Sequence, residues 1–409
     1  MKIYLVGGAV RDQLLDIPSK DKDWVVIGSS SKEMLELGYQ QVGADFPVFI
    51  HPDSHEEYAL ARTERKKGYG YQGFTCHTSP DVTLEEDLLR RDLTINAMAM
   101  DNNGNTIDPY GGRTDIKNKI LRHVSAAFSE DPLRILRVAR FAARFSQLGF
   151  NIAPKTIELM SDMVLRGEAD YLVPERVWQE TQRALKEKSP WTYFETLQQT
   201  NCLEVLFKEL NVLFGIPQPK QHHPEIDCGI HALLSLKAAC ILSIKPEVRF
   251  ASLVHDLGKA CTDSSKWPRH HGHETLGLAP ITQLCARLKI PNNYKELAAL
   301  VSEFHTHIHK AFELTEKTIL KVFKRCDAFR RPGRFHDLLL CCEADSKGRY
   351  GFEENAYPQA DFFKEALSSA NAVTVEDLIS QGFKGKQLGI QIDLHRCNNI
   401  KAFALSYPS

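Results

Sequence analysis

Residues 3–15, IYLVGGAVRDQLL, place a short apolar run directly before two glycines and a helical pattern. The apolar run 3–6 predicts a strand, and residues 9–15 predict a helix. Backbone N–H groups at such a turn attract phosphate. Arg11, one turn into the helix, has a guanidinium that can reach the same anion. The stretch therefore predicts a phosphate-binding turn containing Gly8 and Arg11, with a plain tight turn as the alternative.

Two aspartates, Asp21 and Asp23, lead into a second predicted strand over 24–27. Alternate residues of a strand point to one face, so the two carboxylates converge. Converging ionised carboxylates repel each other unless a cation lies between them, and oxygen-only ligands suit Mg²⁺. Two solvated surface acids are the alternative. Glu57, at the start of a predicted strand over 57–61, is a candidate third carboxylate.

The segment 90–98, RRDLTINAM, carries a second group of polar side chains. Arg91 can bind triphosphate oxygens, and Asp92 can accept a hydrogen bond from a ribose hydroxyl. A helix end with surface charges is the alternative. A further strand is predicted over 48–50. Residues 62–80, rich in glycine, tyrosine and charge, predict a mobile loop.

A helix is predicted to start at Ser129, with Pro132 early in its first turn, and to run through Arg144. At 100° per residue, Arg137, Arg140 and Arg144 share one face of that helix, with Arg134 at its margin. Like charges at this spacing repel by a few tenths of a kcal/mol per pair. An anionic partner is therefore expected, and a solvated basic face is the alternative.

Length and composition exclude several classes of protein. The chain has 409 residues, of which 43% are hydrophobic and 25% charged, which is typical of two or three globular domains. No apolar run approaches the roughly 20 residues of a membrane span, and no signal peptide fits. Ten cysteines without a C-x-x-C pair indicate reduced thiols in the cytoplasm. A net charge of −1 means that local basic patches must hold any nucleic acid.

Helical periodicity dominates from about residue 125 onward. Helices are expected over 154–166, 174–188 and 191–208. The Pro-rich segment 215–224, GIPQPKQHHP, predicts a linker and the main domain boundary. Residues 225–350 are expected to be mostly helical, and residues 360–409 helical at first and then sparse.

Histidines concentrate in the second half of the chain. His255-Asp256 follows His231 by 24 residues, and Asp345 follows Asp256 by 89. Such ligands on separate helices can converge in a bundle core. Mixed nitrogen and oxygen ligation suits Mn²⁺, Ni²⁺ or Co²⁺ better than Mg²⁺. Charge pairing at a helix end is the alternative for the His-Asp pair, and Asp327 is a rival to Asp345.

Other histidines can supply further phosphate or metal contacts. The candidates are His270, His271, His273 and His305. His309, by contrast, is expected on the surface.

The motifs GGAVRD, KDKD, RRDLTINAM, DPYGG and EDPLRILRVARF occur in this order and together resemble the bacterial class II tRNA nucleotidyltransferases, the CCA-adding enzymes. The second half resembles the HD phosphohydrolase superfamily. These resemblances imply an α+β fold: a polymerase-β-type head over 1–125, a helical neck and body over 126–220, a helical HD domain over 221–360 and a tail over 361–409.

The resemblance also implies residue roles. Asp21 and Asp23 would be catalytic and hold Mg²⁺. The triphosphate would contact Gly8, Arg11 and Arg91, with Asp92 at the ribose 2′-hydroxyl. The incoming base would be selected by Glu130, Asp131 and Arg134, with Arg137 and Arg140 fixing the nucleotide and Arg144 along the tRNA backbone. The HD metal would be held by His231, His255, Asp256 and Asp345, with His255 and Asp256 catalytic.

The implied function is template-independent addition and repair of the 3′-terminal CCA of tRNA from CTP and ATP. The loop 62–80 would be tied to adding the final A. The HD domain would add phosphatase, 2′-nucleotidase and 2′,3′-cyclic phosphodiesterase activities. A cytoplasmic monomer or homodimer is expected. The alternatives are a poly(A) polymerase, a nucleotide-signal enzyme and a non-catalytic tRNA-binding module.

Overall fold

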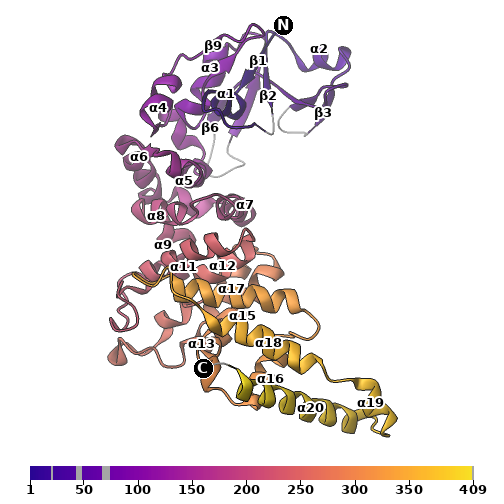
Figure 1. The fold of residues 1–409 in the computed structure, drawn as a ribbon. Coiled ribbons are helices and arrows are strands. Elements are labelled where there is room, and N and C mark those ends of the chain that lie inside the picture. Colours follow the sequence, from indigo (N-terminus) through magenta and orange to yellow (C-terminus); the bar gives the residue numbers. More distant parts are fainter. Residues whose placement is uncertain (20–21, 43–47, 67–73, 408–409) are drawn as a thin grey trace. The chain divides into compact units, whose positions relative to one another are not determined.

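The computed structural model describes all residues except 20–21, 43–47, 67–73 and 408–409 (Figure 1). The chain forms two compact units, Met1–Leu206 and Phe207–Ser409. The division falls before the Pro-rich segment 215–224, which belongs to the second unit. The finer division into head, neck and body, HD domain and tail stays a prediction.

In the described part of the first unit, seven strands form one sheet in the order β3-β4-β5-β2-β1-β8-β9. The strands are β1 (Lys2–Val6), β2 (Asp23–Ile27), β3 (Gln40–Val42), β4 (Val48–Ile50), β5 (Glu57–Leu60), β8 (Ala99–Met100) and β9 (Thr106–Ile107). The central strand β2 is antiparallel to β1 and parallel to β5. Adjacent residues Val25 and Val26 are buried in separate apolar clusters, as the alternation of a two-sided sheet requires. The strands predicted from local apolar runs are confirmed to within a residue.

The loop predicted over 62–80 is wrong at both of its ends. β6 (Arg62–Lys66) and β7 (Phe74–Thr78) pair as an antiparallel two-stranded sheet. The cause is backbone pairing between the two segments, which local composition does not reveal. The middle of the predicted loop, 67–73, lies outside the described residues, so its predicted mobility stays a prediction.

Helices cover the rest of the first unit (Figure 1). They are α1 (Gly8–Leu14), α2 (Ser31–Glu36), α3 (Leu84–Leu89), α4 (Gly112–Asn118), α5 (Leu133–Phe145), α6 (Pro154–Leu165), α7 (Pro174–Leu185), α8 (Trp191–Gln199) and α9 (Cys202–Leu206). α5 packs against both α7 and α8. The helix predicted over 191–208 is broken, because Asn201 adopts a left-handed conformation with φ 58°.

The start of α5 also differs from the prediction. Ser129 does not cap this helix; it lies in the 3₁₀ helix η3 (Ala126–Glu130), and its hydroxyl donates to the Ala126 carbonyl. Asp131 accepts instead from the backbone N–H of Leu133 at 3.0 Å. The acidic residue lies nearer the first free N–H groups, so it takes over the capping role.

The described part of the second unit is helical. Its helices are α10 (Lys208–Asn211), α11 (Cys228–Leu242), α12 (Pro246–Val254), α13 (His273–Leu276), α14 (Leu278–Arg287), α15 (Asn292–His309), α16 (Glu316–Arg325), α17 (Pro332–Lys347), α18 (Pro358–Asn371), α19 (Val375–Ser380) and α20 (Gly385–Ser406). α11, α12, α15 and α17 pack on one another as a bundle. None of the helices described in either unit combines the length and the apolar character needed to cross a bilayer.

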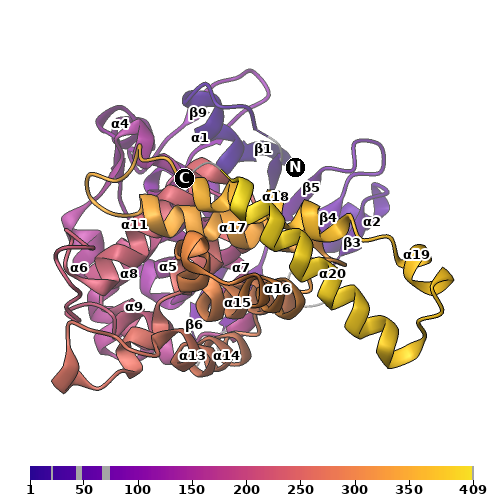
Figure 2. The same cartoon turned by 60° about the horizontal axis from the view of Figure 1, so that its bottom comes forward.

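Two expectations for the second unit are wrong. The segment 215–224 is not a linker: Gln218 is 2% exposed and binds Glu225 and Lys259 through its side-chain amide. The tail is not sparse, because α20 runs for 22 residues along α16 and α18 (Figure 2). Within the described residues α20 buries only Ile400, so it lacks the apolar periodicity that would have predicted a helix.

Candidate active sites

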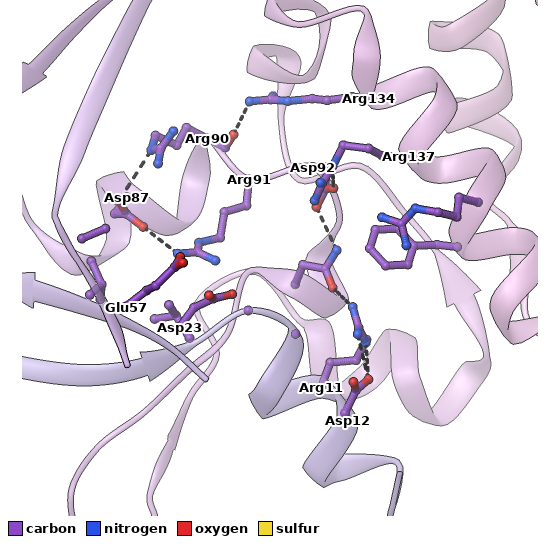
Figure 3. Close-up of a pocket in the computed structure, with 18 of the residues that line it drawn as sticks. Arg11, Asp12, Asp23, Glu57, Asp87, Arg90, Arg91, Asp92, Arg134 and Arg137 are labelled. Atoms are coloured by element: carbon purple, nitrogen blue, oxygen red, sulfur yellow. Dashed lines mark hydrogen bonds and ion pairs between the residues drawn. The ribbon is translucent and has the colours of Figure 1, made fainter. Parts of the chain in front are cut away.

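A cavity of about 890 Å³ opens in the first unit (Figure 3). Its described lining contains ten arginines and six acidic residues. The arginines are Arg11, Arg62, Arg90, Arg91, Arg134, Arg137, Arg140, Arg144, Arg176 and Arg183. An excess of guanidinium groups in a concave site suits a polyanion such as a nucleoside triphosphate.

The glycine turn lies at one end of this cavity. Gly7 has φ 69° and ψ −125°, a conformation open to glycine but strained for other residues. A Cβ at Gly7 would lie 2.8 Å from Nη1 of Arg91. Gly8 begins α1 and also lines the cavity. Both glycines of the predicted turn therefore face the site, and the conformational requirement falls on Gly7.

Two carboxylates lie side by side at the start of the central strands. Asp23 opens β2, and its register partner on the parallel strand β5 is Glu57. Both are exposed residues that line the cavity, with Arg91 nearby (Figure 3). Adjacent carboxylates of this kind can hold a hard divalent cation. Asp21, the other predicted ligand, lies outside the described residues.

The Arg11 guanidinium is fixed inside the cavity wall. It lies 2.7 Å from the Asp12 carboxylate, donates to the Asn96 side chain and lies 5.1 Å from the ring centres of Phe141 and Phe145. Burial lowers the pKa of Arg11, although the Asp12 carboxylate opposes that shift. Arg11 is thus a preorganised cation rather than a flexible surface arginine.

The Asp92 carboxylate is buried and fully ionised. Asn96 donates to one oxygen at 2.9 Å, and Arg137 donates to the other at 2.8 Å. Burial alone would raise the pKa of Asp92, but Arg137 and Asn96 hold it far below its usual range. Each carboxylate oxygen can accept more than one hydrogen bond. Asp92 can therefore fix Arg137 and still accept from a ligand hydroxyl.

Each arginine on the predicted face of α5 has a carboxylate partner. Arg137 pairs with Asp92, Arg140 with Glu180 at 2.7 Å, and Arg144 with Asp12 at 2.9 Å. The expected anionic partners are confirmed, and the alternative of a solvated basic face is wrong. The partners come from other elements, which the sequence pattern of α5 alone does not identify.

The three residues predicted to select the base lie where η3 meets α5. Arg134 donates to the carbonyls of Ala127 and Arg90 at 2.7 and 2.6 Å. Asp131 lies 3.4 Å from Arg176 of α7. Both line the cavity that contains Asp23, whereas Glu130 is not part of its described lining.

Asp87 is a site residue that the sequence reasoning missed. It is buried and lies 3.2 Å from Arg91 and 3.5 Å from Arg90. Burial raises the pKa of Asp87, but the two arginines lower it further, so the net shift is downward. The spacing of four residues between Asp87 and Arg91 within one helical run was the available signal.

A second cluster lies in the core of the α11–α12–α15–α17 bundle. Nε2 of His231 lies 3.0 Å from Asp345, and Nε2 of His255 lies 3.2 Å from Asp256 and 3.6 Å from Asp345. The four predicted ligands therefore come together, and all are buried. Asp327 instead lies near Arg330 and Arg331.

The donor chemistry of this cluster fits a metal. Nδ1 of His255 donates to the Ser252 carbonyl at 2.8 Å, which leaves Nε2 as a lone-pair donor. Nε2 of His255 and Oδ1 of Asp256 are buried, and neither has a hydrogen-bond partner among the described residues. Leaving such groups unpaired costs about 1–3 kcal/mol each, and a transition metal would satisfy both.

Further side chains surround the predicted ligands. Glu225 and Lys259 are buried, with Glu225 3.0 Å from Nδ1 of His231 and Lys259 2.6 Å from Asp256. His309 is not a surface residue, because its Nε2 lies 2.7 Å from Asp345 and its Nδ1 lies 2.8 Å from the Tyr357 hydroxyl. Its spacing of four residues from His305 on α15 was the missed signal.

The additional histidine candidates divide into two groups. His273 and His305 are buried beside Asp256. Burial lowers the pKa of His305 to about 3, so its imidazole is neutral. His270 binds the Thr262 hydroxyl and the Pro217 carbonyl, and His271 is exposed. Only the first group therefore lies within the cluster.

The fold and the first cavity define a nucleotidyltransferase. Residues 3–122 match the family described as the poly A polymerase head domain, and residues 149–214 match the family described as the probable RNA and SrmB-binding site of polymerase A. A multifunctional CCA protein of Hahella chejuensis is 55% identical over 98% of this chain and 96% of its own length. One of Shewanella frigidimarina is 57% identical over 100% and 98%. The chain belongs to the family of multifunctional CCA proteins.

Solved structures share the fold. The Thermotoga maritima CCA-adding enzyme complexed with tRNA aligns over 100% of this chain and 88% of its own, with a TM-score of 0.66 and 20% identity. The Bacillus stearothermophilus CCA-adding enzyme in complex with CTP aligns over 98% and 89%, with a TM-score of 0.63 and 22% identity. The α+β fold class expected from the sequence is confirmed.

Proposed function

We propose that this chain adds and repairs the 3′-terminal CCA of tRNA, using CTP and ATP without a nucleic acid template. The supporting observation is the cavity in which Asp23 and ten arginines lie together, in a chain that is 55–57% identical to multifunctional CCA proteins. Those relatives favour CCA addition over the alternative of a poly(A) polymerase. The partners of the reaction are tRNA, CTP and ATP.

Asp21 and Asp23 hold Mg²⁺ in this proposal, and Glu57 is a third carboxylate beside them. When bound, Mg²⁺ stabilises charge on the transferring phosphate and favours ionisation of the attacking 3′-hydroxyl. Gly8, Arg11 and Arg91 bind the triphosphate. The fixed position of the Arg11 guanidinium supports this role, because a preorganised cation needs little reorganisation when the anion binds.

The base is selected by side chains rather than by a template strand. Asp131 accepts a hydrogen bond from the exocyclic amine of C or A, and Arg134 donates to the neighbouring acceptor on the base. G and U present a carbonyl where Asp131 requires a donor, and such a mismatch costs about 1–3 kcal/mol. Glu130 completes this set, Asp92 accepts from the ribose 2′-hydroxyl, and Arg137 and Arg140 fix the nucleotide.

The test is nucleotide incorporation by the full chain on tRNA that lacks its terminal CCA. With CTP alone we expect two residues to be added, and with CTP and ATP together we expect CCA and no more. A run of A residues with ATP alone would indicate a poly(A) polymerase. Failure to add any nucleotide with Mg²⁺ present would remove the proposal.

We also propose a metal-dependent phosphohydrolase at the second cluster, with phosphatase, 2′-nucleotidase and 2′,3′-cyclic phosphodiesterase activities. His231, His255, Asp256 and Asp345 hold Ni²⁺, Mn²⁺ or Co²⁺. The unpartnered Nε2 of His255 and Oδ1 of Asp256 support this assignment. On tRNA ending in a 2′,3′-cyclic phosphate, His255→Ala should leave the end blocked. Full healing of that end by the variant would contradict the role of the cluster.

The setting of the reaction is likewise a proposal. We infer that the protein works in the cytoplasm as a monomer or homodimer. Light scattering at micromolar concentration distinguishes the two oligomeric states, and cell fractionation tests the location.

A further inference from the structure

We propose that the histidine–aspartate cluster is a two-metal centre, in which Asp256 bridges the first ion to a second ion held by His273 and His305. The second site deepens the proposed phosphohydrolase function and rests on it. Its ligand is a divalent transition metal, and the substrate class of the centre is a phosphate ester.

The two carboxylate oxygens of Asp256 face different sets of histidines. Oδ2 lies 3.2 Å from Nε2 of His255 and 3.7 Å from Nε2 of His231. Oδ1 lies 3.4 Å from Nε2 of His273 and 3.8 Å from Nε2 of His305. A carboxylate with one oxygen toward each of two imidazole pairs has the geometry of a bridging ligand.

The protonation of His273 and His305 leaves both Nε2 atoms as lone-pair donors. Nδ1 of His273 donates to the His270 carbonyl at 2.7 Å. Nδ1 of His305 lies 3.0 Å from the carbonyls of both Val301 and Ser302. Because a carbonyl only accepts, the proton of each neutral ring is on Nδ1. Each Nε2 therefore points its lone pair toward the interior.

These lone pairs need a cation between them. The two Nε2 atoms lie 3.1 Å apart, and two lone-pair donors repel at that distance. Oδ1 of Asp256 is buried and has no hydrogen-bond partner in the described part of the chain. A divalent transition metal accepts all three atoms at once, and nitrogen with carboxylate oxygen is a ligand set that such metals favour. A proton shared between the two rings is the competing explanation.

The backbone brings the second site against the first. Gly258, two residues after Asp256, packs so closely on α13 that a Cβ there would lie 1.9 Å from the His273 carbonyl and 2.5 Å from the Gly277 nitrogen. Only glycine allows this approach. The close contact holds His273 next to Asp256.

A pair of metals suits phosphate ester hydrolysis. Two ions about 3.5–4 Å apart can stabilise both the attacking and the leaving oxygen of an in-line displacement. The proposed first and second ligand sets share one carboxylate, which favours a short separation of this kind.

The test is metal stoichiometry in the full chain. We would prepare the protein in an Asp23→Asn background, which weakens metal binding at the head, and load it with Mn²⁺. Elemental analysis should give two ions per chain, and electron paramagnetic resonance should show exchange coupling between them. His273→Gln and His305→Gln should each reduce the count to one and abolish the coupling. His271→Ala, at an exposed neighbouring histidine, should retain both ions.

The outcomes separate the second site from the proposed function. A count of one ion in the parent, unchanged by His273→Gln, would overturn the two-metal centre while the phosphohydrolase proposal stands. A count of zero, with hydrolysis intact, would overturn both. Thermal unfolding of each variant identifies any that fails to fold, and the coupling signal of the parent then decides the question alone.

Discussion

At the scale of single residues, the first site depends on side chains held in strained or buried positions. Gly7 has a backbone conformation that favours glycine, Arg11 is packed between two phenylalanine rings, and Asp92 is ionised in the protein interior. Each feature costs folding free energy. Each also fixes the position of a charge in the cavity, which is what preorganised recognition of a triphosphate requires.

Gly7→Ala tests the strained turn. The left-handed conformation costs a non-glycine residue about 1–3 kcal/mol, and the new Cβ would lie 2.8 Å from Nη1 of Arg91. We expect a higher KM for CTP together with a lower free energy of unfolding. Gly8→Ala is the matched comparison, because its Cβ would lie 3.5 Å from the nearest atom outside its own helix, Nη2 of Arg11. Equal kinetic and stability effects of the two substitutions would contradict this account.

Asp92→Asn tests the buried carboxylate through pH. The folded-state pKa of Asp92 lies below its unfolded value, so its ionisation stabilises the fold above about pH 4 and this contribution is lost as pH falls through the folded pKa. The variant should lose about 2 kcal/mol at pH 7, a value reduced by solvent screening because Arg137 is 36% exposed. The difference from the parent should narrow below pH 4. Urea unfolding across this pH range measures it, and a constant difference is the contrary result.

At the scale of elements, α5 is the helix that organises the cavity. Three of its arginines are bound by carboxylates of α1, α7 and the segment after α3. The pair between Arg140 and Glu180 joins α5 to α7, and both side chains are buried.

Double-mutant analysis tests this junction. Glu180→Gln leaves Arg140 buried without its carboxylate and should lower the free energy of unfolding by about 3 kcal/mol. Arg140→Met in the same chain should restore part of that loss, because the uncompensated charge is then gone. Trp178, on α7, is a natural fluorescence probe for urea unfolding. Additive effects of the two substitutions would show that the pair does not couple the helices.

Local sequence predicts some elements better than others. Strands such as Val48–Ile50 were found from a single apolar run because one buried face fixes their pattern. The β6–β7 pair and α20 were missed because backbone pairing and packing of a mostly exposed helix leave little local signal. The direction of the α5 arginines was predictable from helical spacing. Their partners, 40 to 132 residues away in sequence, were not.

The sites show the same contrast. The convergence of His231, His255, Asp256 and Asp345 was predictable from residue types, because few other roles unite such residues in a helical segment. Asp87, Glu225 and the buried position of His309 follow from three-dimensional packing. The pairing of Asp23 with Glu57 required the strand register, which sequence spacing suggests but does not determine.

At the scale of the whole molecule, the chain carries one polar site in each compact unit. The ligands of the second cluster are buried, so metal binding should stabilise the unit that contains them. Addition of Ni²⁺ at 100 times its dissociation constant should raise the free energy of unfolding by about 2.7 kcal/mol.

Calorimetry of the chelator-treated protein, with and without added Ni²⁺, measures this stabilisation. Asp345→Asn keeps the shape of the side chain but removes its charge, and it should weaken the effect. A thermal transition unmoved by Ni²⁺, or moved equally in the variant, would contradict metal binding at the cluster.

The most direct test of the central claim, that two chemistries reside in separate sites of one chain, is a crossed assay of two variants. Asp23→Asn should reduce CTP incorporation into tRNA about 100- to 1,000-fold and leave hydrolysis of a 2′,3′-cyclic phosphate unchanged. His255→Ala should do the reverse, and Asp53→Asn, at an exposed acid outside the cavity lining, should change neither rate. Loss of both activities in either folded variant, or full CTP incorporation by Asp23→Asn, would contradict the account.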